Sequence, residues 1–464
     1  MPNQPPVILV HAINGSVLRD EYPLPPGPVW DPGYFAVEAF ERIAVHPESP
    51  APSPETALFE AHGPSRVAGS HAVRLIYGEL LDLLRKDLPE KNEPPVPAFV
   101  FSYDWRQDNR VSASRLGEFI AEVIERTNLL RHYAGRCDSV DLVGHSMGGF
   151  VIAACLCAGK HRSSNGRPRV RRVVTLGTPF LGAVDALAKL ATGESEIVGQ
   201  RRHTEREIAR LTPSLYQLLP VYDRAFFDTP TRKPLSLLDP ANWQESVLDS
   251  IAESIRQHTT DRSLAQQGPA ADSQRQAAAR KLLERRLEAW RDLHKLIDDL
   301  DPDDLLLERN GWLPIVGIDE KTRFAAGLSL RTDPGSGRSR KEWDFLIAEA
   351  DYDGSTNPAA AREHRLRLGD GVVPLRASVP TWIDRKRVVC VAERDFGGLF
   401  HLEDALVRKF TTLHVILPLM NLVQRWVLSF LKGRRWGEVW GRPLPDVRSA
   451  DWLPPIPGVG VKAD

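Results

Sequence analysis

The segment that most constrains this chain is a Gly-x-Ser-x-Gly turn at residues 144–148, which lies between a β-like apolar run and an apolar helical pattern. The run Ser139–Val143 has the composition of a buried strand. Gly144 and Gly148 allow a turn so tight that larger side chains would clash, and the strained turn lifts the Ser146 hydroxyl above the sheet edge. The pattern predicts a nucleophile at Ser146, and an ordinary turn between strand and helix is the plainer alternative.

Other short apolar runs recur along the chain, and helical patterns follow them. This alternation is typical of a parallel sheet that is buried on both faces. We therefore expect an α/β fold with a mostly parallel central sheet flanked by helices. The expected strands are Val7–Val10, Ala98–Ser102, Ser139–Val143, Val170–Leu176, Leu313–Ile318 and Arg387–Ala392, and the expected helices include Ser70–Lys86 and a second one that starts at Ser112.

Two long segments interrupt this alternation. Residues 19–70 are rich in proline, which disfavours regular structure and predicts a lid-like excursion. Residues 183–310 are charged and helical in pattern, and their apolar residues from Leu283 to Leu300 recur at three- and four-residue spacing. Such a stripe predicts a cap that packs on the body, with docking to a membrane or a partner as the alternative. We divide the chain into a first core part (1–182), a helical cap (183–310), a second core part (311–441) and a Pro-rich tail (442–464), which we expect to be draped or disordered.

The composition of the chain argues against several classes of partner and cofactor. The 464 residues include 60 Lys and Arg against 61 Asp and Glu, so no overall basic field favours nucleic acid as a partner. The four cysteines are too few and too scattered for a disulfide framework, and no pair has the spacing of a zinc site. We expect a cytoplasmic protein, because the N-terminal residues lack a signal-peptide pattern. No metal or other cofactor is expected to take part in the chemistry.

The most apolar late segment, residues 413–431, is interrupted by Pro418 and by polar residues. This interruption predicts a packed helix rather than a membrane span. Trp and Arg residues are frequent near the C-terminal end, which leaves peripheral contact with a membrane as an open alternative to ordinary packing.

A serine nucleophile needs a histidine base and a carboxylate that orients the base, and in a fold of this kind the chain order is Ser, Asp, His. Asp370 lies in a glycine-flanked loop, and His401 follows the last expected strand, so we assign these two residues as acid and base. Asp319 at the end of a strand is the alternative acid. His364 precedes Asp370 and is therefore the weaker choice, and His414 lies inside an apolar helical pattern that is more simply explained by packing.

The tetrahedral intermediate of such a reaction needs two backbone N–H donors. The residue after the nucleophile, Met147, supplies one of them. The loop after the first strand supplies the other, and we expect it to be the amide of Ile13. His11 in the same loop is expected to brace the backbone.

Six segments, in this order, resemble the lecithin:cholesterol acyltransferase-like branch of the α/β-hydrolases. They are residues 6–16, Tyr103–Arg106 with the sequence Tyr-Asp-Trp-Arg, the serine turn at 144–148, residues 175–182, Gly369–Val373 and His401–Glu403. The resemblance implies an α/β-hydrolase fold with a lid and a cap, and the triad Ser146, Asp370 and His401. It also implies that Asp104, Trp105, Arg106 and His145 support the active site. Two features depart from the family: His11-Ala12 replaces its usual Pro-Gly, and residues 19–70 contain no Cys that could tie the lid.

These observations predict a serine-dependent lipid acyl-ester hydrolase, of the lipase or phospholipase type, that forms an acyl-enzyme. An acyltransferase with the same triad and an alcohol acceptor is the first alternative. Two further alternatives are a lipase that a regulatory protein gates through residues 183–310 and a catalytically silent scaffold. An intact set of Ser146, Asp370 and His401 argues against the scaffold.

Overall fold

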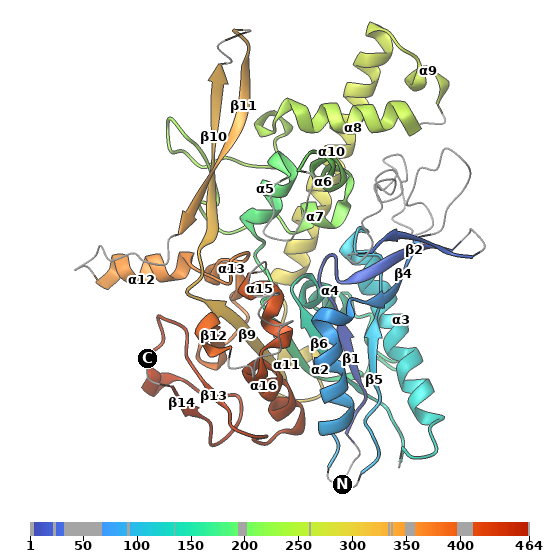
Figure 1. Cartoon of the computed structure of the whole chain (residues 1–464), viewed down its shortest axis with the longest axis vertical. Coiled ribbons are helices and arrows are strands. Elements are labelled where there is room, and N and C mark those ends of the chain that lie inside the picture. Colours follow the sequence, from blue (N-terminus) through green and yellow to red (C-terminus); the bar gives the residue numbers. More distant parts are fainter. Residues whose placement is uncertain are drawn as a thin grey trace.

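The centre of the molecule is a six-stranded parallel sheet with the strand order β12-β9-β7-β6-β1-β5 (Figure 1). The computed structural model describes residues 4–21, 25–31, 67–90, 93–133, 135–193, 202–258, 261–332, 335, 337–348, 358–396 and 412–462. The strands are β1 (Val7–Val10), β5 (Ala98–Phe101), β6 (Val140–His145), β7 (Val170–Leu176), β9 (Trp312–Ile318) and β12 (Val389–Ala392). All six coincide with expected strands to within a few residues at their ends, and the expected α/β architecture is confirmed.

Helices cover both faces of this sheet, as the uninterrupted apolar strands require. Alternate residues of β1 point to opposite faces, so that Ile8 and Val10 join one buried cluster while Val7 and Leu9 join the other. The first cluster includes α3 (Asn109–Asn128) and α4 (Met147–Cys157), and the second includes α2 (Arg74–Asp87) and α16 (Asn421–Lys432). Helix α4 is buried almost all round, because it lies between the sheet and the cap.

The cap is helical and lies above the C-terminal ends of the strands in Figure 1. Its longest helix, α10, contacts α4, α7 and α8, and its apolar stripe of Leu283, Leu287, Leu293 and Ile297 is buried. The expectation that this stripe packs on the body is therefore met. The cap helices are α5 (Val184–Thr192), α6 (Arg202–Leu211), α7 (Pro213–Gln217), α8 (Glu245–His258), α9 (Arg262–Ala265), α10 (Pro269–Asp298) and α11 (Pro302–Leu305).

Two three-stranded sheets were not expected from the sequence. Strand β8 (Phe226–Asp228) of the cap pairs in parallel with β10 (Thr322–Thr332), which forms a long projecting hairpin with β11 (Ser339–Ala348). The hairpin lies just after β9 in the chain, so strand pairing ties the cap to the second core part. The ends of the lid-like excursion form a second antiparallel sheet of β2 (Ser16–Asp20), β3 (Gly27–Trp30) and β4 (Val67–Ala72). Residues 32–66, most of that excursion, lie outside the described residues.

The late apolar segment is a broken rather than a continuous helix. It consists of α15 (Leu413–Ile416), η6 (Leu417–Leu419) and α16, and Pro418 lies in η6, two residues before the break at Met420. In the described part of the chain no single helix is long and apolar enough to cross a membrane, although this pair, bent by 55°, would pass by length and composition. Most of the two helices is buried in the second apolar cluster.

The described residues of the Pro-rich tail, 442–462, pack on the core. The indole Nε1 of Trp452 donates a hydrogen bond to the carbonyl oxygen of Val388 at 2.9 Å, and Ile456 is buried beside α16. The tail carries β14 (Gly460–Val461), which pairs with β13 (Trp440–Gly441). The remaining described helices are α12 (Pro358–Arg367), α13 (Leu375–Ser378), and the 3₁₀ turns η3 (Pro240–Asn242), η4 (Arg385–Arg387), η5 (Glu393–Asp395) and η7 (Ser449–Asp451).

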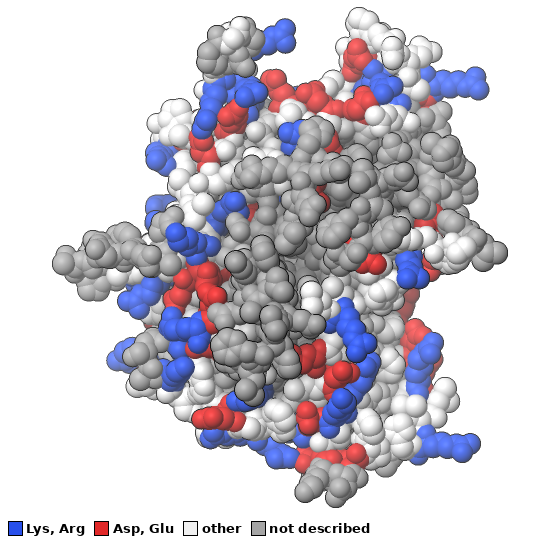
Figure 2. Space-filling view, in the orientation of Figure 1, with Lys and Arg blue, Asp and Glu red and all other residues white. Residues whose placement is uncertain are grey.

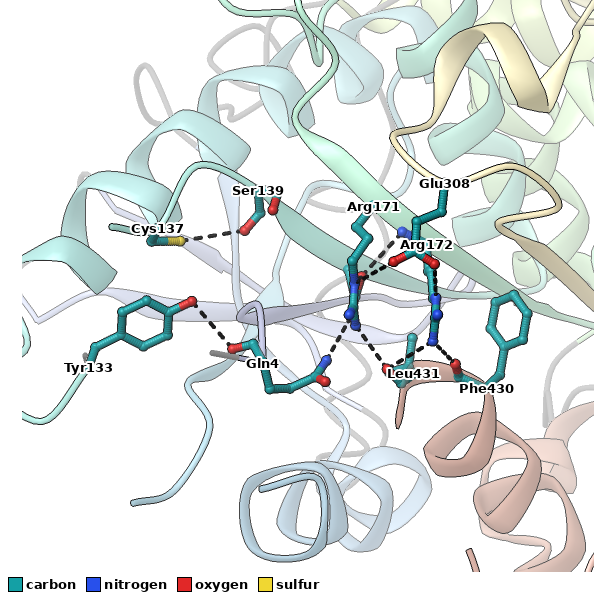
Figure 3. Close-up of polar contacts among 10 residues, drawn as sticks. Gln4, Tyr133, Cys137, Ser139, Arg171, Arg172, Glu308, Phe430 and Leu431 are labelled. Carbon is teal, nitrogen blue, oxygen red and sulfur yellow. Dashed lines mark hydrogen bonds and ion pairs between the residues drawn. The ribbon is translucent and has the colours of Figure 1, made fainter. Parts of the chain in front are cut away.

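A partly buried polar network fastens the sheet to α16 at the ends of the strands remote from Ser146 (Figure 3). The carboxylate of Asp141 on β6 accepts hydrogen bonds from Arg171 Nε and Gln4 Nε2, each at 2.9 Å. Arg171 Nη2 in turn donates to the carbonyl oxygen of Leu431 at 2.9 Å. Burial raises the pKa of Asp141, which the positive charge of Arg171 opposes. A satisfied network of this kind holds β6 and β7 against the C-terminal end of α16.

Candidate active site

Ser146 occupies a strained turn between β6 and α4. Its φ is 52° and its ψ −124°, a conformation that costs a non-glycine residue steric energy. A Cβ on Gly148 would lie 2.1 Å from the carbonyl oxygen of Val10, and one on Gly144 would lie 2.7 Å from the Cα of Gly149. The tight turn that the glycine spacing predicts is therefore present, and both glycines are required by contact with backbone.

A histidine and a carboxylate complete a hydrogen-bonded line from Ser146. His414 Nε2 lies 2.8 Å from Ser146 Oγ, and His414 Nδ1 lies 2.7 Å from Asp370 Oδ2. The other carboxylate oxygen of Asp370 accepts the backbone N–H groups of Val372 at 3.1 Å and Val373 at 2.7 Å. Because the carboxylate only accepts, Nδ1 of His414 carries the proton and Nε2 is free to accept the serine hydroxyl. This is the arrangement of a nucleophile, a base and an orienting acid.

The assignment of the base from the sequence needs correction. His401 lies outside the described residues, and the histidine between Ser146 and Asp370 is His414, which the sequence analysis explained by packing alone. Helix α15 is a single turn, in which Leu413 and Ile416 pack into the core while His414 faces the serine. An imidazole inside an apolar run after the last strand fits the order Ser, Asp, His, and this polarity mismatch was the signal that could have identified it.

The rival acid and the weaker rival base lie elsewhere. Asp319 forms an ion pair with Arg394 at 2.8 Å, and His364 lies in α12. Asp370 is the carboxylate that contacts the imidazole, as expected from the glycine-flanked loop.

The two expected oxyanion donors belong to segments that touch each other. Met147 is the first residue of α4, and Ile13 lies in the loop after β1. Strands β1 and β6 are neighbours, with Val10 opposite Gly144, so both segments leave the sheet at the same edge. The close approach of Gly148 to the carbonyl oxygens of Val10 and His11 brings the first turn of α4 against that loop.

The loop after β1 is braced by aromatic side chains. The ring of His11 stacks on Tyr103 at 4.3 Å between centroids, and Tyr103 Oη donates a hydrogen bond to the carbonyl oxygen of His11 at 2.9 Å. Trp105 Nε1 donates to the carbonyl oxygen of Ser16 at 3.1 Å. Burial lowers the pKa of His11 to about 4, so its imidazole is neutral and braces the loop as a packed ring.

Asp104 and Arg106 form a buried ion pair beside this loop. Arg106 Nε and Nη2 donate to the two carboxylate oxygens of Asp104 at 2.8 Å and 2.7 Å. Both side chains are almost fully buried, so the pair supports the structure beside this loop and is not a surface ion pair. The backbone of the same segment holds the cap, because Ser214 of α7 donates from Oγ to the carbonyl oxygen of Trp105 at 2.7 Å.

His145 lies directly before the nucleophile and is also buried. Its Nε2 lies 2.9 Å from the carbonyl oxygen of His414. Burial, with a smaller effect of the neighbouring imidazole of His414, lowers the pKa of His145 to about 3. Among the described residues, no group of three or more His, Cys, Asp or Glu side chains could hold a metal ion.

One family of known proteins matches part of the chain. A family model described as lecithin:cholesterol acyltransferase matches residues 76–266. The expected resemblance to that family is confirmed. The matched segment contains the Tyr-Asp-Trp-Arg motif, the serine turn and much of the cap, and it supports a lipid ester hydrolase or acyltransferase. Comparison of the sequence with curated proteins gives no match.

Comparison with solved structures finds similar chains at low sequence identity. A complex of Tle4 with Tli4 contains a chain that is 15% identical, with a TM-score of 0.51, over 82% of this chain and 89% of that chain. The lipase of Staphylococcus hyicus is 13% identical, with a TM-score of 0.37, over 93% of this chain and 97% of that chain. The protein has the α/β-hydrolase fold.

Proposed function

We propose that the protein is a serine-dependent lipid acyl-ester hydrolase with the triad Ser146, His414 and Asp370. The observation that carries the proposal is the hydrogen-bonded line from Ser146 Oγ through His414 to Asp370. The family match over residues 76–266 supports a lipid acyl ester as the substrate class.

The reaction follows from the positions of these groups. His414 Nε2 takes the hydroxyl proton of Ser146, and the serine oxygen attacks the carbonyl carbon of the ester. The backbone N–H groups of Ile13 and Met147 donate to the oxyanion of the tetrahedral intermediate. His414 then gives its proton to the leaving alcohol, and an acyl-Ser146 intermediate forms. Asp370 holds the imidazole in the required tautomer and stabilises its charged form.

Water completes hydrolysis by attacking the acyl-enzyme with His414 again as the base. The second candidate function is acyl transfer, in which a lipid hydroxyl takes the place of water, and the match to an acyltransferase family favours it. The two reactions share every step up to the acyl-enzyme, so the product distinguishes them.

A protein partner is a further proposal. One similar solved structure is a complex of Tle4 with Tli4, and the charged cap of this chain offers a surface on which a partner could gate access to Ser146. Ester hydrolysis that appears only when a partner is added would support this regulation.

The decisive experiment compares the wild type with Ser146→Ala on p-nitrophenyl esters and on mixed phospholipid vesicles. Released fatty acid and any new ester are followed by mass spectrometry, and a fluorophosphonate probe reports the reactive serine. We expect activity and labelling in the wild type and neither in Ser146→Ala. Labelling without hydrolysis would mean that the substrate or the partner is missing, and wild-type protein that neither labels nor hydrolyses would contradict the proposal.

A further inference from the structure

A buried tyrosine on α2 connects the two sides of the candidate active site. Tyr77 Oη accepts a hydrogen bond from the backbone N–H of Ala12 at 3.0 Å, next to the expected oxyanion donor Ile13. The same oxygen lies 2.8 Å from His145 Nδ1. Both Tyr77 and His145 are buried, and the residue that follows His145 is the nucleophile.

The two ends of this series of hydrogen bonds fix the direction of each bond in it. His145 is neutral, because burial lowers its pKa to about 3, so its ring carries one proton. Its Nε2 faces the carbonyl oxygen of His414 at 2.9 Å, and a carbonyl only accepts, so the proton is on Nε2. Nδ1 must then accept the hydroxyl proton of Tyr77, and the Tyr77 oxygen must accept from Ala12.

All the hydrogen bonds of the series therefore run in one direction. The N–H of Ala12 donates to the Tyr77 oxygen, Tyr77 O–H donates to His145 Nδ1, and His145 Nε2 donates to the carbonyl oxygen of His414. Burial raises the pKa of Tyr77, so the phenol keeps the proton it donates. The backbone N–H of His414 donates to the carbonyl oxygen of Asp370 at 2.9 Å, so the backbone of the base is held both at its N–H and at its carbonyl oxygen.

We propose that Tyr77 is a positioning residue for the reaction, which through His145 fixes the oxyanion loop and the backbone of His414 at their working separation. The inference rests on the proposed function, because it assigns a role relative to Ser146 and His414. Tyr77 touches neither of their reacting atoms; it acts through Ala12 and His145. Reaction rates depend on the alignment of base, nucleophile and oxyanion donors at the scale of tenths of an ångström.

The variant Tyr77→Phe tests this role, because it keeps the ring and removes the hydroxyl. The backbone N–H of Ala12 and Nδ1 of His145 then lose their shared partner, and neither is reached by bulk water. We expect kcat for p-nitrophenyl butyrate to fall about tenfold, with KM within about twofold, because alignment and not substrate binding is lost. Labelling of Ser146 by a fluorophosphonate should slow by a similar factor.

Tyr216→Phe is the matched control. Tyr216 is a fully buried tyrosine of the cap whose hydroxyl donates to the carbonyl oxygen of Arg210 at 2.8 Å, away from the triad. Both variants should lower the melting temperature by similar amounts, whereas only Tyr77→Phe should lower kcat. A folded Tyr77→Phe protein with wild-type kcat and labelling rate would overturn the inference, as would an equal loss of kcat in Tyr216→Phe. Wild-type protein without any labelling would instead contradict the proposed function, so the two failures are distinct.

Discussion

The imidazole of His414 lies 2.8 Å from the hydroxyl of Ser146 although 268 positions of sequence separate the two residues. The contact exists because Ser146 directly follows the end of β6, and α15 lies against that end, where the carbonyl oxygen of His414 is 2.9 Å from His145 Nε2. Charged side chains of both signs are interspersed among the described residues on the face shown in Figure 2, whereas Ser146, His414 and Asp370 are buried.

Replacement of the base should remove nearly all activity. In His414→Ala the serine hydroxyl has no acceptor for its proton, so we expect kcat to fall by about 10⁴-fold or more. Esterase assays and fluorophosphonate labelling measure the loss. His401→Ala, tested in parallel, should lose much less activity. A larger loss in His401→Ala than in His414→Ala would restore His401 as the base.

Loss of the buried carboxylate of Asp104 should destabilise the fold. Asp104→Asn removes the carboxylate charge that faces the buried guanidinium of Arg106, which costs about 3 kcal/mol in free energy of unfolding. Urea unfolding measures the change. Asp451→Asn breaks the exposed ion pair with Arg448 and should leave the unfolding midpoint almost unchanged, so equal losses in both variants would argue against burial as the cause.

A methyl group on Gly148 should disrupt the serine turn. In Gly148→Ala the new Cβ meets the carbonyl oxygen of Val10, a backbone atom that cannot move without displacing β1. We expect labelling of Ser146 to fall by at least tenfold, because about 1.4 kcal/mol of strain or misalignment suffices for that factor. Gly460→Ala is the control, since no atom lies within 4 Å of its added Cβ. A Gly148→Ala protein with wild-type labelling would contradict this account of the turn.

Acid should unfold the protein through its buried histidines. Burial lowers the pKa of His145 to about 3 and that of His11, His161 and His294 to about 4, each from 6.5. Between those values the unfolded chain binds protons that the folded chain does not, so stability is full above pH 6.5 and declines as the pH falls toward 4. Two carboxyl groups have the opposite effect on stability. Burial raises the pKa of Glu320 to about 7 and also raises that of Asp141, so these groups stabilise the folded chain as the pH falls.

The measurement is the urea midpoint as a function of pH. His161→Gln keeps a donor for the carbonyl oxygen of Leu305 and removes one titrating group, so its stability should decline less steeply below pH 6.5. A wild-type urea midpoint that does not change between pH 6.5 and 4 would show that the histidines do not dominate the pH dependence of stability.

The parts of the site that the sequence could predict are those set by local sterics. The strand, the glycines and Ser146 are neighbours in sequence, so their geometry follows from a short segment. The loop of Asp370 was equally predictable, because its flanking glycines allow the turn in which its carboxylate accepts two backbone N–H groups.

The base and Tyr77 depend on contacts between distant segments. His414 lies among apolar residues because one turn of α15 buries its neighbours while the imidazole faces β6, and the sequence pattern does not distinguish this from packing. Tyr77 occupies an apolar position of α2, and its partners Ala12 and His145 belong to other segments of the chain. The projecting hairpin of β10 and β11 was missed because the residues at its tip, where β10 ends and β11 begins, are mostly polar or charged and resemble a solvated loop.

The positive φ of Ser146 has a consequence for how this chain can be improved. Glycine adopts that conformation without steric cost, so Ser146→Gly would relax the backbone of the turn while removing the nucleophile. The working chain is thus not the most stable chain that this fold permits. A search for thermostable variants that did not also select for catalysis would therefore favour replacement of Ser146 at an early stage.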